Sequence, residues 1–145
     1  MTQLSQHFSL EELTASETAS RKGWDNTPND QELANLKRLA TMLEAVRTII
    51  GKPIHINSGF RSKLVNDAVG SKDSSQHRLG CAADLKVHGM TSREVVMKIR
   101  DSGLAVDQCI DEFSSWCHLS IPSYEQDRPR RQFLTIDRTG TRPFA

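Results

Sequence analysis

The chain has 145 residues, of which 37% are hydrophobic and 26% charged, and its 19 basic and 18 acidic side chains give a net charge of +1. Such a length and composition are typical of one globular domain, which we place over residues 1–145. The balanced charge gives no support for a nucleic-acid partner, and no stretch approaches the roughly 20 apolar residues of a membrane span.

The first part of the chain is predicted to be mainly helical. A short helix is expected after Ser9, followed by an irregular segment over 16–27. Thr27 is then predicted to cap a long helix, because Pro28 follows it at the favoured first helical position. Apolar side chains recur at three- and four-residue steps from 33 to 50, which indicates an amphipathic helix.

The remaining elements are shorter and alternate between the two types. We predict strands over 53–57, 83–87 and 132–136, helices over 63–69 and 92–102, and a hairpin with strands 105–110 and 116–121. Helices that precede and interrupt these strands favour the α+β fold class, with a small antiparallel sheet and helices packed against it.

The segment SQHRLGCAAD, residues 75–84, is chemically the most informative part of the chain. It places His77 and Asp84 seven positions apart, and His118 follows later in the sequence WCHLS. Two histidines and one aspartate are ligands that a catalytic Zn²⁺ favours, and three protein ligands leave one position for water. The pattern therefore predicts a zinc hydrolase with one ion.

Strand alternation predicts where these side chains point. Along the strand that begins at Trp116, His118 shares a face with Trp116, whereas the neighbouring residues are apolar. Asp84 likewise projects away from Ala83 and Leu85. If the two strands are neighbours, Asp84 and His118 could meet at one metal, with Trp116 as either a cleft wall or a core residue.

The pattern Ser-x-His-x-x-Gly-x-Ala-x-Asp followed by Trp-x-His resembles the zinc D-Ala-D-Ala carboxypeptidase family, which includes phage and bacterial cell-wall peptidases. The resemblance covers nearly the whole chain and implies a hedgehog/DD-peptidase-like fold. It implies that His77, Asp84 and His118 hold the zinc. It also implies that Arg61 faces the scissile carbonyl oxygen and that Ser75 lines the substrate pocket.

The general base is less direct to assign. Many members of the family place it three residues before the last histidine, where this chain has Ser115. The shorter members resemble this chain in having Glu-Phe before Trp-x-His, which favours Glu112 as the base. Asp111 is the alternative.

The resemblance implies a zinc metallopeptidase acting on peptidoglycan stem peptides, either as a D-Ala-D-Ala carboxypeptidase or as an L-Ala-D-Glu endopeptidase. The N-terminal residues lack a signal-peptide pattern, so we expect a phage or prophage lysis enzyme, made in the cytoplasm and released to the cell wall. A monomer is compatible with this size. The alternative is a non-catalytic module on the same fold that binds the cell wall or belongs to a phage structure.

The three cysteines offer a rival interpretation. Cys81, Cys109 and Cys117 could join His118 in a structural zinc site, or a cysteine could be a nucleophile. No Cys-x-x-Cys pair exists, and Cys117 should face away from His118 in a regular strand. We expect reduced, mostly buried thiols instead.

Overall fold

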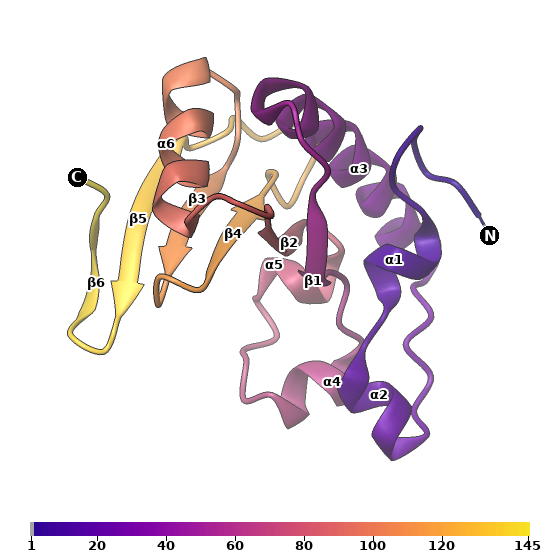
Figure 1. The fold of residues 1–145 in the computed structure, drawn as a ribbon. Coiled ribbons are helices and arrows are strands. Elements are labelled where there is room, and N and C mark those ends of the chain that lie inside the picture. The colour runs from indigo at the N-terminus through magenta and orange to yellow at the C-terminus, as the bar shows by residue number, and fades with distance from the viewer. Residues whose placement is uncertain (1) are drawn as a thin grey trace.

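The computed structural model describes residues 2–145, in which helices surround a six-stranded sheet (Figure 1). The helices are α1 (Leu10–Thr14), α2 (Glu17–Lys22), α3 (Asp30–Ile50), α4 (Lys63–Ala68), α5 (Gln76–Leu79) and α6 (Ser92–Ser102). The strands are β1 (His55–Ser58), β2 (Ala82–Lys86), β3 (Gln108–Glu112), β4 (Trp116–Ser120), β5 (Gln132–Asp137) and β6 (Gly140–Pro143). Within residues 2–145, no helix has both the length and the apolar character needed to cross a bilayer.

The strands lie in the order β1-β2-β4-β3-β5-β6. Neighbouring strands are antiparallel except for β3 and β5, which are parallel. The α+β prediction is confirmed, but the sheet is mixed rather than purely antiparallel as expected, because the chain crosses from the end of β4 to the far side of β3. The terminal strands β5 and β6 form one edge of the sheet, drawn in yellow in Figure 1. Strand β6 was not predicted, since its four residues are exposed and include glycine and proline.

The hydrophobic core lies between one face of the sheet and the two helices α3 and α6. Apolar side chains from both helices and from β2, β3 and β4 form a single buried cluster. On the two central strands, the side chains in this cluster are Ala83, Leu85, Cys117 and Leu119. Because side chains alternate along a strand, Asp84 and His118 lie on the opposite face.

Two expectations for the N-terminal part were wrong. Residues 17–22 form a helix rather than an irregular segment, because the Ser16 hydroxyl accepts from the Ala19 amide and Gly23 ends the helix with a φ of 69°. The cap of the long helix is Asn29 rather than Thr27. Asn29 forms a reciprocal capping box with Glu32, which outweighs the proline signal.

The hairpin β3–β4 has the predicted strand pair but a different tip. Residues 113–115 form the tip, and Glu112 belongs to β3, where it lies opposite Trp116. Phe113 and Ser114 have φ values of 55° and 54°, a left-handed conformation that costs free energy for residues with a side chain. The tight tip thus holds the ends of both strands at a fixed separation.

Candidate metal centre and active site

The three side chains of the predicted ligand set converge on the face of the sheet opposite the hydrophobic core. Asp84 of β2 lies directly opposite His118 of β4, and α5 brings His77 to the same place. Asp84 Oδ1 lies 3.3 Å from His77 Nε2 and 3.1 Å from His118 Nδ1. All three ligand atoms lie within 4.8 Å of one another. The condition named in the sequence analysis is met, because β2 and β4 are neighbours and Asp84 lies opposite His118.

The hydrogen bonding of His77 fits a metal site. Its Nδ1 lies 2.8 Å from the carbonyl oxygen of Gly59, and a carbonyl can only accept, so Nδ1 carries the proton. In the neutral ring, Nε2 then directs a lone pair toward the Asp84 carboxylate. Burial lowers the pKa of His77 and so disfavours a second proton. A cation bound by these groups would remove this repulsion, and backbone acceptors of this kind commonly orient metal-binding histidines.

Asp84 is held as an anion in spite of its burial. Burial alone would raise its pKa, but the hydrogen bond from His118 Nδ1 opposes that effect and keeps the pKa below its ordinary value. Arg61 adds a positive charge, with Nη2 3.7 Å from Asp84 Oδ2. One carboxylate and two imidazoles are a donor set that suits zinc with an open fourth position.

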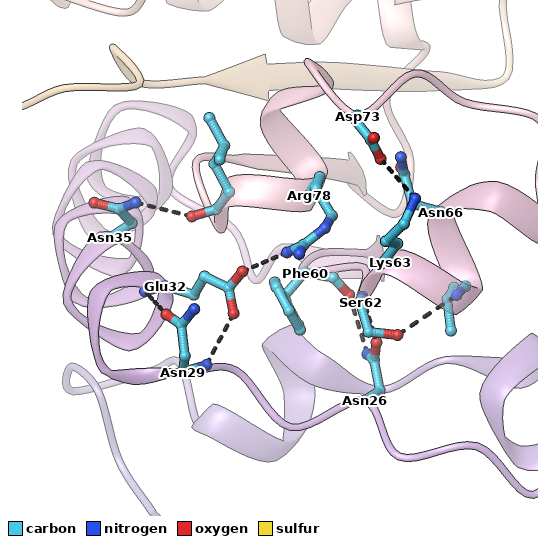
Figure 2. A network of polar contacts seen from close by, with 12 residues as sticks. Asn26, Asn29, Glu32, Asn35, Phe60, Ser62, Lys63, Asn66, Asp73 and Arg78 are labelled. Carbon is cyan, nitrogen blue, oxygen red and sulfur yellow. Dashed lines mark hydrogen bonds and ion pairs between the residues drawn. The ribbon is translucent and has the colours of Figure 1, made fainter.

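Helix α3 fixes α5, the short helix that carries His77. Gly80 ends α5 with a φ of 80°, and a Cβ there would lie 2.8 Å from the Glu32 carbonyl oxygen. Arg78 pairs with the Glu32 carboxylate, and the Asn35 amide donates to the Leu79 carbonyl at 2.9 Å (Figure 2). The close contact between α5 and α3 therefore requires a glycine at position 80, and hydrogen bonds between the two helices lie next to it.

A second glycine positions the acceptor of His77. A Cβ at Gly59 would lie 2.4 Å from the carbonyl oxygen of Leu13 in α1. That same Leu13 carbonyl accepts from the Phe60 amide at 2.8 Å. The backbone of residue 59 is thus pressed between α1 and the imidazole of His77.

Asn26 holds the turn that carries Arg61, a role that the sequence did not predict. Its amide nitrogen donates to the Phe60 carbonyl at 3.1 Å, and its oxygen accepts from the Ser62 amide at 2.8 Å (Figure 2). The Arg61 amide itself donates to the His77 carbonyl at 3.0 Å. Burial lowers the pKa of Arg61, while Asp84 and Glu112 oppose the shift.

Glu112 faces the cluster from β3. Its Oε1 lies 3.9 Å from His118 Nδ1, and its Oε2 accepts from the Trp116 indole nitrogen at 3.0 Å. Burial raises the pKa of Glu112, and the attraction of His118 only partly offsets this. The indole bond leaves one carboxylate oxygen directed toward the ligand cluster.

Asp111 and Ser75 have different surroundings. The Asp111 carboxylate is buried, belongs to the opposite strand face and accepts from the Ser92 hydroxyl at 2.5 Å. The geometry therefore favours Glu112 over Asp111 as the acid nearest the cluster. The Ser75 hydroxyl accepts from the His77 amide at 3.3 Å and caps α5, so it contacts the ligand helix directly.

The cysteines do not gather around His118. All three are free and buried, as expected. The sulfur atoms of Cys109 and Cys117 contact each other at 3.6 Å within the core, on the face opposite His118. Burial raises the pKa of Cys81 to about 11, so its thiol stays protonated at neutral pH. Neither the structural cysteine site nor a cysteine nucleophile fits this arrangement.

Comparison with known proteins agrees with this geometry. A 65-residue segment is 42% identical to the zinc D-Ala-D-Ala carboxypeptidase of Streptomyces albus G and covers 43% of this chain. The aligned part spans only 26% of that relative. The sequence pattern of the peptidase M15 family matches residues 6–120, which contain Arg61 and all three clustered side chains. The chain therefore belongs to the peptidase M15 family.

Proposed function

We propose that this protein is a zinc-dependent peptidase that hydrolyses peptide bonds in peptidoglycan stem peptides. The observation that carries the proposal is the convergence of His77, Asp84 and His118, with Arg61 and Glu112 on its border. The family membership and the name of the Streptomyces relative support this class of reaction and substrate. In this assignment His77, Asp84 and His118 would hold one zinc ion.

Zinc bound there would supply Lewis-acid polarisation of the peptide carbonyl and a lower pKa for water. Glu112 accepts the proton of the attacking water at Oε1 and returns it to the nitrogen of the leaving amine. Its raised pKa suits this task, because a base must hold the proton between the two steps. Trp116 keeps Oε2 engaged, so the proton is transferred at Oε1.

Arg61 stabilises the negative charge that develops on the carbonyl oxygen. Its guanidinium is mostly buried, and Asn26 fixes the backbone on both sides of it. A charge that is already in place costs little reorganisation when the oxyanion forms. Ser75 and Trp116 border the cluster and are our candidates for contacts with the substrate.

Digestion of purified muropeptides, followed by mass spectrometry, tests the proposal. We expect loss of either a terminal D-Ala or the peptide from D-Glu onward, complete inhibition by a chelator, and recovery with zinc. The mass of the product distinguishes the carboxypeptidase from the endopeptidase. Intact muropeptides after incubation with zinc-loaded protein would contradict the proposal, and chelator-insensitive wall binding would favour the non-catalytic module. A phage lysis role and release to the wall remain predictions.

A further inference from the structure

Helix α5 has a second anchor besides its contacts with α3. Gln76, the first residue of α5 and the neighbour of His77, directs its amide nitrogen into a buried polar site. This nitrogen donates to Asp107 Oδ2 at 3.0 Å and to the Ile121 carbonyl at 2.9 Å, and the Ser123 hydroxyl lies at 3.3 Å. Because the site offers acceptors to the nitrogen, the opposite orientation of the amide would place oxygen against oxygen.

Asp107 connects this anchor to the C-terminal segment. Asp107 is only 3% exposed, and its carboxylate would be costly to bury without partners. Arg130 donates its backbone amide to Oδ1 at 3.0 Å and its Nη2 to Oδ2 at 2.7 Å. Its Nε lies 3.1 Å from Oδ1 and 3.2 Å from Oδ2. The guanidinium is thus bound to both oxygens, a geometry that fixes the carboxylate in place.

The segment that supplies Arg130 lies beyond residues 6–120, which carry the family pattern. Residues 131 and 132 continue the attachment, because their amides donate to the carbonyls of Val106 and Asp107 at 3.0 and 2.9 Å. Strand β5 begins there and runs parallel to β3. A continuous polar chain therefore runs from the C-terminal segment through Asp107 and Gln76 to the helix of a candidate zinc ligand.

We propose that Gln76, Asp107 and Arg130 are positioning residues for the metal centre, through which the C-terminal segment holds α5 and the His77 imidazole in their binding geometry. None of the three reaches the ligand atoms. The inference uses the zinc site of the proposed function but concerns the preorganisation of the chain. Residues that orient metal ligands from outside typically contribute about 10–100-fold to metal affinity.

The test compares three variants of the full-length protein. Gln76→Met removes the amide with little change in length, and Arg130→Met removes the guanidinium of a side chain that is 54% exposed. The matched control is Arg142→Met, which breaks another 2.7 Å arginine–aspartate pair of the C-terminal segment, to Asp137, away from α5. Zinc affinity is measured by competition with a chromogenic chelator, well below the melting temperature of each variant.

We expect Gln76→Met to weaken zinc binding at least tenfold, Arg130→Met to weaken it severalfold, and Arg142→Met to bind as the wild type does. In the metal-free protein, we expect faster hydrogen exchange at the Gly80 and Cys81 amides, which close α5, in the first two variants only. Wild-type affinity and exchange in Arg130→Met would overturn the inference, even if Gln76→Met failed to fold.

The two measurements, zinc affinity and hydrogen exchange, distinguish failure of this inference from failure of the proposed function. A wild type that binds zinc but leaves muropeptides intact contradicts the function and leaves the anchor supported by the affinity data. A wild type that binds no zinc contradicts the function as well. The exchange measurement then decides the anchor alone, because it needs no metal: unchanged exchange in both variants overturns it.

Discussion

Two acidic side chains that flank the length of β3, Asp107 just before it and Glu112 at its end, have opposite surroundings. Asp107, just before the strand, is bound by Arg130 and Gln76, whereas Glu112, its last residue, has Trp116 as its hydrogen-bond donor. Burial would raise the pKa of both carboxyls. At Asp107 the bonds from Arg130 outweigh burial and lower the pKa, but at Glu112 burial prevails. Direct hydrogen bonds from the Arg130 guanidinium favour the ionised form of Asp107, whereas Glu112 has no such bonds and can take up a proton more readily.

The largest expected effect is at the Glu112 end. Glu112→Gln should lower kcat by about 10²–10⁴-fold, because the amide cannot accept the proton of water. Zinc affinity should stay close to the wild-type value, since Glu112 is not in the ligand set. Steady-state kinetics and chelator competition measure the two quantities. The matched variant is Asp111→Asn: if it lost as much turnover while remaining folded, Asp111 would be the base.

Arg61 lies beside the reactive end and should have the next largest effect. Arg61→Met should lower kcat and kcat/KM together by about 10²–10³-fold, because it removes a charge that acts on the oxyanion of the transition state. The measurement is the kinetics of peptide release from muropeptides. A rise in KM with unchanged kcat would instead assign Arg61 to substrate binding.

Asp107, just before β3, should affect the free energy of unfolding. Asp107→Asn should lower the free energy of unfolding by about 1–3 kcal/mol at pH 7, since it weakens charged hydrogen bonds in a buried site. The folded pKa of Asp107 is lowered, so its stabilisation is present above the unfolded value of about 3.9 and is lost as pH falls through the folded value. Urea denaturation should therefore show a constant difference above about pH 5 that shrinks in stronger acid. A difference independent of pH would contradict this account.

A change at Trp116 tests whether the surroundings of Glu112 set its pKa. Trp116→Phe removes the indole donor that favours the ionised form of Glu112. The pKa of Glu112 should rise further, so the acid limb of kcat/KM should move to higher pH. Above that limb the loss of turnover should stay below about tenfold. An acid limb that did not move would mean that Glu112 is not the group whose titration limits the reaction.

The smallest expected effect is at the hairpin tip. Ser114→Gly should raise the free energy of unfolding by at most about 1 kcal/mol, because glycine adopts the observed φ of 54° without steric cost. Thermal denaturation measures the change. Ser115→Gly, next to it but outside the left-handed region, is the control and should be neutral or destabilising.

The sequence indicated the residues of the candidate site better than it indicated the contacts that hold those residues in place. His77, Asp84 and His118 could be named as one set because their residue types suit zinc and because the pattern around them resembles that of a known family. The cap of α6 was equally readable, since Thr91 and Glu94 are three residues apart and bond reciprocally. The capping pair is a local signal, and its spacing alone determines the contact.

The supporting contacts have no comparable signal. Gln76 and Asp107 are 31 residues apart, and nothing in either neighbourhood indicates the other. The parallel pairing of β5 with β3 depends on the path of the chain after β4, which residue patterns do not encode. Asn29 and Glu32, in contrast, have the spacing of a capping box, so the true start of α3 could have been found.

The glycine at position 59 has a practical consequence for anyone who prepares this protein. Its backbone touches Leu13 on one side and receives the imidazole N–H of His77 on the other. A recombinant protein that begins after Thr14 would still contain all the residues of the sheet, so the truncation would not be expected to affect the site. It would nevertheless remove the wall against which that histidine is aligned, and an inactive preparation could be mistaken for an inactive protein.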